Sequence, residues 1–165
     1  MTLQILRRFV VMITLVLLQA LVLNHIHIYN CATPLLYVLV PLYFNSEQPR
    51  WSSLLWCFCT GLLVDIFSNT PGVAAGAMTF VGLMQPYILA MLKPKEDDEA
   101  YSPTIEDLGT MKYLTYAFLV IFIYCLIFFT LESFSLFNII LWAESIGGST
   151  LLTLFIAFIL EKSKG

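Results

Sequence analysis

Two carboxylic acids, Asp65 and Glu144, stand inside otherwise apolar stretches of the sequence. An ionisable side chain within a membrane segment is costly, so it is a candidate for a functional role by default. Two such acids could transfer protons or line a binding cavity. A transporter of this size would usually show internal repeats or broken helices in corresponding halves, and the sequence has no evident repeat. The two acids are therefore the first residues whose environment has to be explained.

The other residue patterns do not favour catalysis or metal binding. His25-x-His27 has no third donor nearby, and Cys57-x-Cys59 does not match a metal-binding spacing. The sequence contains no zinc-binding His/Glu spacing, nucleophile elbow, phosphate-binding loop or paired-carboxylate motif. We therefore expect no catalytic residues, no cofactor and no metal, and a protein that is not an enzyme.

The composition is that of an integral membrane protein. Of the 165 residues, 59% are hydrophobic and only 12% are charged, which is too few charges to cover the surface of a soluble domain. Several apolar runs have about the length needed to cross a hydrocarbon core of roughly 30 Å. The net charge of −3 argues against nucleic acid as a partner. The expected surroundings are the lipid bilayer.

The apolar runs predict an all-α protein in which residues 1–165 form a single membrane domain. Six candidate spans lie at about residues 9–23, 34–44, 51–67, 73–92, 113–131 and 138–160. The first follows Arg7-Arg8 but lacks a small-residue cleavage site, so it is expected to be a retained helix and not a signal peptide. The second would rise only about 16 Å. It must extend into its flanks, thin the bilayer or lean on neighbouring helices.

The distribution of basic residues supports the short second span. With the N-terminus in the cytoplasm, six spans place all eight Lys and Arg residues on the cytoplasmic side, as the positive-inside rule expects. Without the second span, Arg50, Lys93, Lys95 and Lys112 would lie outside, and the basic residues would be divided four against four. We therefore expect a compact bundle of six transmembrane helices with both termini in the cytoplasm.

In this topology both acids lie in the outer half of the membrane, where the sequence has no Lys or Arg. Each carboxyl group must be protonated, hydrogen-bonded, solvated in an outward-open cavity or satisfied by a partner. The turn after Asp65 exposes the N–H groups that begin the fourth helix, and a helix N-terminus favours a carboxylate. Thr70 or Asn69 is expected to cap that helix, with Pro71 at its first position. Asp65 would then tie the third and fourth helices together, with partner binding or a cavity lining as the alternatives.

Small residues give the same hairpin close-packing faces. Cys57, Gly61 and Asp65 share one face of the third helix, and Gly72-x-x-x-Gly76 forms a small-residue face on the fourth. Such faces allow close backbone approach, which drives helix association in lipid. The spacing leaves open whether a helix of this chain or of another fills the groove. It also leaves open whether the chain forms a homo-oligomer.

Glu144 precedes a second patch of small and polar residues, Gly147-Gly148-Ser149-Thr150. From this position it could face the Asp65 hairpin across a cavity in the outer leaflet. The candidate residues for partner binding or for the hairpin structure are therefore Gly61, Asp65, Pro71, Gly72, Gly76 and Glu144.

The run GLLVDIFSNTPGVAAGAMTF, residues 61–80, resembles the signature region of the bacterial rod shape-determining protein MreD family. The shared features are Gly61, three apolar residues, Asp65, two apolar residues, a short polar turn, Pro71-Gly72 and a small-residue helix. The size, the six spans and the short external loops agree over essentially the whole chain. The family often has an apolar residue between the proline and the glycine, whereas here Pro71 and Gly72 are adjacent.

The resemblance implies a non-enzymatic, multi-pass subunit of the cell-elongation complex in the bacterial cytoplasmic (inner) membrane. Its partner would be MreC, through the membrane span and the periplasmic domain of that protein. Through MreC it would couple MreB filaments to the SEDS glycosyltransferase and transpeptidase that build lateral peptidoglycan, and so regulate cell shape. The resemblance also implies a fold similar to the substrate-binding S-components of ECF transporters. The alternative function is therefore binding or transport of a small molecule in an outward-facing cavity near Asp65 and Glu144.

Overall fold

The computed structural model describes residues 2–21, 34–45, 48–92, 103–133 and 139–164, and all regular elements within these ranges are helices. In chain order they are α1 (Thr2–Leu21), η2 (Leu36–Val38), α2 (Leu39–Leu42), α3 (Arg50–Ser68), α4 (Val73–Leu92), α5 (Ile105–Leu108), α6 (Thr110–Ser133) and α7 (Ile139–Lys164). The short helix α5 lies in the predicted cytoplasmic connector and was not expected. His25, His27 and Cys31 lie outside the described residues.

Four helices, α3, α4, α6 and α7, are long and apolar enough to cross a membrane, so the chain is a multi-pass membrane protein. They correspond to the last four predicted spans. The apolar part of α1, Arg8–Leu21, is shorter, and the predicted span continues beyond the described residues. The short second span is not among the four helices.

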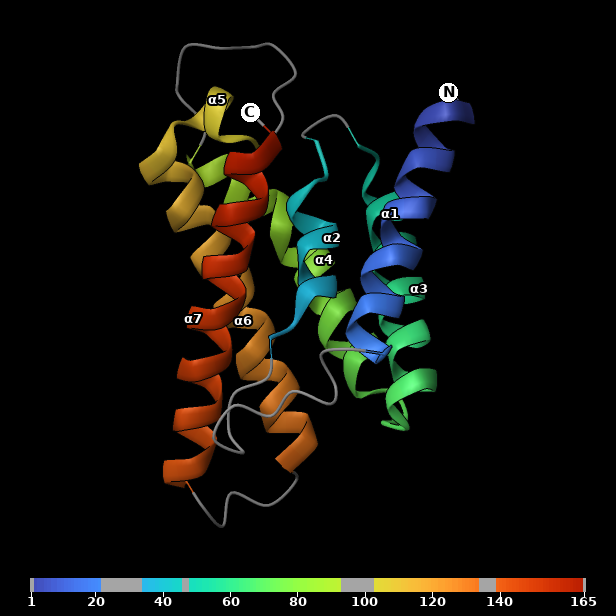
Figure 1. Ribbon diagram of the computed structural model, residues 1–165, viewed down its shortest axis with the longest axis vertical. Coiled ribbons are helices and arrows are strands. Elements are labelled where there is room, and N and C mark those ends of the chain that lie inside the picture. The colour runs from blue at the N-terminus through green and yellow to red at the C-terminus, as the bar shows by residue number, and fades with distance from the viewer. Residues whose placement is uncertain (1, 22–33, 46–47, 93–102, 134–138, 165) are drawn as a thin grey trace.

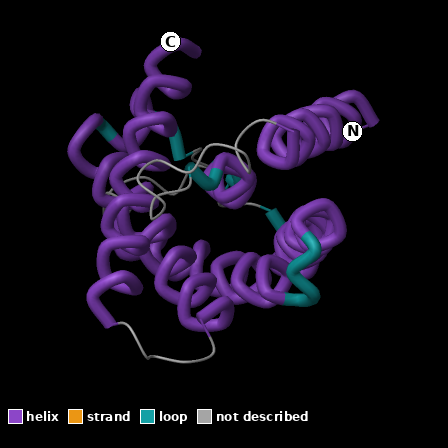
Figure 2. The backbone as a smooth tube through the Cα atoms, turned by 60° about the horizontal axis from the view of Figure 1, so that its bottom comes forward, coloured by secondary structure: helices purple, strands orange, loops and turns teal. Residues whose placement is uncertain are grey.

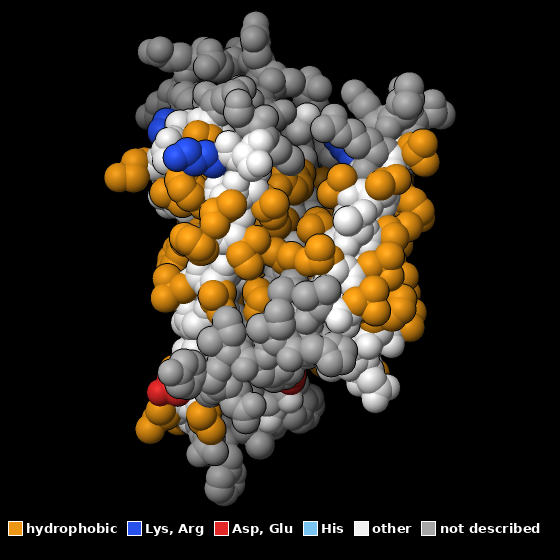
Figure 3. All heavy atoms as spheres, viewed as in Figure 1, with side chains coloured by type: hydrophobic (Ala, Val, Ile, Leu, Met, Phe, Trp, Pro, Cys, Tyr) orange, Lys and Arg blue, Asp and Glu red, His pale blue; other side chains and the backbone are white. Residues whose placement is uncertain are grey.

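The N-terminal end of α1 and the C-terminal end of α7 lie at the same end of the bundle (Figure 1). The basic side chains on the face drawn in Figure 3 lie toward this end, and the acidic ones lie toward the opposite end. The end of the bundle where α1 begins and α7 finishes also holds the helix turns that contain Arg8, Arg50, Lys112 and Lys162. This arrangement has the polarity that the positive-inside rule describes.

The long helices surround the short segment formed by η2 and α2 (Figure 2). This segment has three residues of 3₁₀-helix followed by four of α-helix, which is less helix than the predicted span of residues 34–44. Its residues 34–42 are all buried. The sequence offered support by neighbouring helices as one way to accommodate so short a span, and the structure shows such contacts.

Side chains from other helices bind the backbone of this short segment at its first end. The Leu35 N–H donates to Thr153 Oγ1 of α7 at 3.1 Å, and the Leu36 N–H donates to Gln19 Oε1 of α1 at 2.9 Å. Gln19 and Thr153 are themselves almost completely buried. An N–H group that lacks a partner in hydrocarbon costs several kcal/mol, so these two side chains allow the helix to begin inside the bundle.

The other end and the middle of the segment are held in the same way. Gln85 of α4 donates through Nε2 to the Phe44 carbonyl oxygen at 3.3 Å and to the Tyr116 hydroxyl at 2.8 Å. Between the two ends, the hydroxyls of Tyr37 and Tyr124 are hydrogen-bonded to each other. The short segment is thus connected to α1, α4, α6 and α7 by polar contacts as well as by apolar packing.

The orientation of the short segment can be tested by cysteine labelling. In a chain whose natural cysteines are replaced by alanine, Asn45→Cys should react with a membrane-impermeant maleimide in inverted vesicles but not in spheroplasts. His25→Cys, which lies before the segment in the predicted external loop, should show the opposite pattern. Labelling of Asn45→Cys and His25→Cys from the same side would show that the short segment does not cross.

Candidate functional site

The Asp65 side chain, which is 5% exposed near the end of α3, caps the N-terminus of α4. Its Oδ1 accepts hydrogen bonds from the Ala74 N–H and from the Thr70 hydroxyl, both at 2.9 Å. Its Oδ2 accepts a hydrogen bond from the Ala75 N–H, also at 2.9 Å. The carboxylate therefore lies where the N–H groups of a helix end and the positive end of the helix dipole both favour an acid.

The backbone of Asp65 ends one helix while its side chain begins the next. The Asp65 carbonyl oxygen accepts hydrogen bonds from the N–H groups of Asn69 and Thr70, the latter at 3.2 Å. Asn69 adopts the left-handed conformation with φ 56°, and Gly72 follows with φ 84°. A left-handed residue just after a helix is a common way to stop it, and glycine takes this conformation without strain. Asp65 therefore stabilises both the end of α3, through its backbone, and the start of α4, through its side chain.

The capping of α4 differs from the sequence expectation in the residue that accepts the hydrogen bonds. Thr70 and Asn69 were the expected caps, with Pro71 as the first helical residue. The structure starts α4 at Val73, places Pro71 and Gly72 in the turn, and uses the Thr70 hydroxyl as a donor to Asp65. A carboxylate with two acceptor oxygens can bind two successive N–H groups and a hydroxyl at once, which a single threonine oxygen cannot do.

Gly61 allows the two helix backbones to touch one turn before Asp65. A Cβ atom at Gly61 would lie 2.5 Å from Ala75 Cα and 2.6 Å from the Ala74 carbonyl oxygen. These are backbone atoms that no side-chain rearrangement can move away. The groove on the Cys57–Gly61–Asp65 face is therefore filled by α4 of the same chain, which answers the question that the spacing left open.

A second close approach, between Gly82 and Cys57, was missed by the sequence analysis. A Cβ atom at Gly82 would lie 2.7 Å from Cys57 Sγ. Gly82 follows Ala75 by seven residues and so lies on the same face of α4 two turns later. That spacing was the signal that would have identified it.

Gly72 and Gly76 do not form the close-packed surface that the sequence predicted. Nothing lies within 4 Å of a Cβ atom placed at Gly72, and at Gly76 the only such atom is Leu131 Cδ1, at 3.8 Å. Both glycines are exposed. Ala74 and Ala75 make the close contact instead, because they lie on the side of α4 that faces Gly61.

The structure does not bring Glu144 together with Asp65. Glu144 is exposed on α7, and this helix packs mainly on α6 and also contacts η2. Lys162 follows Glu144 by 18 residues, or about 27 Å of helix, a distance close to the thickness of the hydrocarbon core. Glu144 therefore lies about one membrane thickness from Lys162 along α7, on an exposed face of the helix.

The sequence analysis also missed the neutral polar residues of the core, Gln19, Gln85 and Thr153. All three bind backbone groups of the short central segment. The search for ionisable residues passed over them because an amide or a hydroxyl costs less to bury than a charge. A glutamine within an otherwise apolar helix was the feature of the sequence that could have indicated these buried hydrogen bonds.

Within the described residues, no group of three or more His, Cys, Asp or Glu side chains could hold a metal ion. Comparisons of the chain with protein-family models, with curated proteins and with solved structures find no match.

Replacing Asp65 should destabilise the protein. Asp65→Ala leaves two buried N–H groups and a hydroxyl without their acceptor, which should cost about 2–4 kcal/mol and lower the unfolding midpoint in detergent by roughly 5–15 °C. Asp65→Asn, which keeps one acceptor oxygen, should lose less. Glu144→Ala is the matched control because it removes an exposed acid, and its midpoint should stay close to that of the unchanged protein. Equal midpoints for Asp65→Ala and Glu144→Ala would contradict the capping role.

The glycines offer a second stability test. Gly61→Ala should separate α3 from α4 and cost at least about 2 kcal/mol, because its new methyl group meets backbone atoms. Gly76→Ala, on an exposed face, should change stability by no more than about 1 kcal/mol and can increase it through helix propensity. Thermal unfolding of the two purified variants measures the difference. Similar midpoints would show that the close backbone contact is not needed.

Proposed function

We propose that this chain is a non-enzymatic scaffold subunit of the cell-elongation (rod) complex, of the MreD type, in the bacterial cytoplasmic membrane. In this function it binds MreC and helps couple MreB to lateral peptidoglycan synthesis by the SEDS glycosyltransferase and transpeptidase. A six-span topology with cytoplasmic termini and a fold similar to ECF transporter S-components belong to the same proposal.

The observation that carries the proposal is the Asp65-capped hairpin. The residues that resemble the MreD signature are the ones that build it: Gly61 allows the backbone contact, Asp65 caps α4, and Pro71-Gly72 form the turn. A signature whose residues hold the fold together fits a family whose members act by binding other proteins. A catalytic family would more often share residues that point into a cavity.

The use of the buried polar groups also favours a structural function. Asp65, Gln19, Gln85 and Thr153 all bind backbone groups, and the Tyr37 and Tyr124 hydroxyls bind each other. Side chains committed in this way make the bundle rigid. A rigid bundle suits a scaffold that positions other proteins.

The exposed side of α4 is the surface that we assign to the partner helix. The Gly61 face is occupied within the chain, whereas Gly72 and Gly76 are exposed on the outer half of α4, and Phe80 follows on the same face. Exposed small residues let a second helix approach closely in lipid. The single span of MreC has the geometry to use such a face.

The alternative function, small-molecule binding between Asp65 and Glu144, has less support. Both oxygens of Asp65 already accept hydrogen bonds, from Thr70, Ala74 and Ala75. Glu144 is exposed on a helix that does not pack closely on the hairpin. A substrate would have to displace structural hydrogen bonds to reach Asp65.

Affinity purification tests the scaffold function. The tagged chain, purified from membranes of its own bacterium, should bring down a protein with one membrane span and a periplasmic domain of the MreC type. Gly76→Leu should reduce that recovery several-fold without lowering the unfolding midpoint, because the larger side chain covers the proposed contact. Gly147→Leu is the control, since Gly147 is an equally open glycine on α7. Recovery of no such protein, or only of further copies of this chain, would overturn the proposal.

A further inference from the structure

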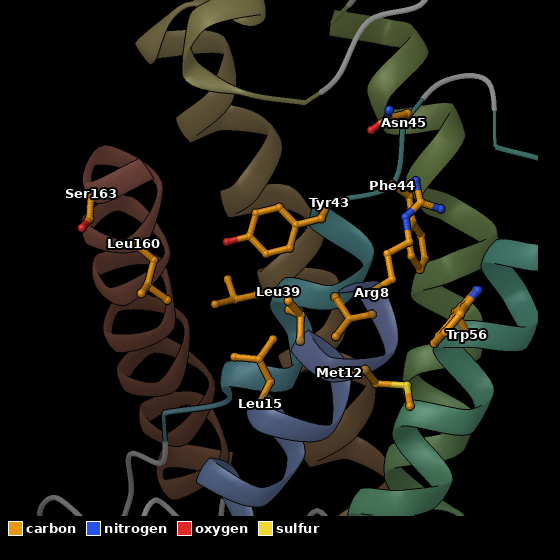
Figure 4. Close-up of a pocket in the computed structure, with 12 residues that line it drawn as sticks. Arg8, Met12, Leu15, Leu39, Tyr43, Phe44, Asn45, Trp56, Leu160 and Ser163 are labelled. Carbon is orange, nitrogen blue, oxygen red and sulfur yellow. The ribbon is translucent and has the colours of Figure 1, made fainter. Parts of the chain in front are cut away.

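A cavity of about 560 Å³ lies between α1 and α7, with α2 as its floor (Figure 4). α1 packs on α3 and η2, whereas α7 packs mainly on α6, so the two helices flank the short segment from opposite sides. Val11 of α1 and Leu160 of α7 line the cavity and are about 40% and 38% exposed. The cavity is therefore open to the side of the bundle, where the bilayer would lie.

The lining of the cavity changes from polar to apolar along its length. Arg8, Asn45 and Ser163 line it at the end where α1 begins and α7 finishes. Met12, Leu15 and Leu39 line the part deeper in the membrane. From Arg8 to Leu15 the cavity follows α1 for two turns, or about 10 Å. A cation at the interface above an apolar groove is complementary to a molecule with an anionic head and a hydrocarbon tail.

Arg8 has the donors needed to bind a phosphate. Its Nη1 donates to Gln48 Oε1 at 2.7 Å, which holds the side chain at the mouth of the cavity. A guanidinium has five N–H donors in a planar arrangement that fits phosphate oxygens, so one such bond leaves capacity for a ligand. The apolar part of α1 begins at Arg8, which places the guanidinium at headgroup depth.

The cavity has the size of a small-ligand site. Its volume lies within the range of about 300–1,000 Å³ that is usual for small-molecule sites. A hydrocarbon chain is narrow enough to enter, and the Arg8 guanidinium at the mouth favours an anionic head above it.

We propose that this groove binds a membrane glycerophospholipid, with its phosphate at Arg8 and an acyl chain between Val11, Leu15 and Leu160. Two other charged groups belong to this end of α7. Lys162 is exposed beside Ser163, and the buried Glu161 lies near Tyr43 and Tyr113. The bound lipid fills the opening between α1 and α7.

Lipid retention by the purified full-length chain tests the proposal. After extensive washing in detergent, the unchanged protein should retain about one phospholipid per chain, measured by phosphorus analysis and by mass spectrometry of the extract. Val11→Trp, which fills the cavity from an exposed position, and Arg8→Gln should each reduce the retained lipid several-fold. Adding phosphatidylglycerol or phosphatidylethanolamine to delipidated protein should raise its unfolding midpoint, and less so in these two variants.

Two control variants separate the site from general effects. Val10→Trp places the same side chain on the adjacent, exposed position of α1 outside the cavity, and Lys112→Gln removes an exposed charge at the same end of the bundle. Both should retain lipid as the unchanged protein does. Equal retention in all four variants, or a protein in place of lipid in the cavity, would overturn the proposal. The result does not depend on whether MreC is a partner.

Discussion

The hydrocarbon core offers no water to a backbone N–H or C=O group, and the rest of this structure depends on how the chain meets that constraint. Two places need help, because helices begin or end there with buried backbone groups that have no partner within the helix. At the hairpin, Asp65 supplies a carboxylate to the first N–H groups of α4. At the short central segment, Gln19, Thr153 and Gln85 supply the missing partners. The buried polar side chains of this bundle thus lie where backbone groups at helix ends need partners, and apolar side chains fill the rest of the core.

The parts that could be predicted from the sequence are those governed by local pattern. The four long helices follow from continuous apolar runs, and their bounds in the structure lie within a few residues of the predicted ones. The tie between Asp65 and the start of α4 was accessible because the acid and the helix N-terminus are only nine residues apart. A short separation restricts the geometry, so that few other partners can be reached.

The parts that could not be predicted depend on contacts between distant segments. Whether Ala75 or Gly76 faces α3 is decided by the rotation of α4, and a helix pattern with small residues on several sides does not determine that rotation. The caps of the central segment come from residues 17, 41 and 118 positions away. Spacing along one helix carries no information about such partners. The isolated position of Glu144 likewise follows from the packing of α7 on α6, which no local motif encodes.

The long separation between Leu35 and Thr153 has a consequence for biogenesis. Residues 34–45 are translated well before α7, so the segment leaves the ribosome before Thr153 has been synthesised. Until then its terminal backbone groups lack their final partners and cannot be stable in lipid. The segment must wait at the interface, within the insertion machinery or beside Gln19 alone. The caps of the short central segment are therefore completed only after α7 has been translated and has packed beside it.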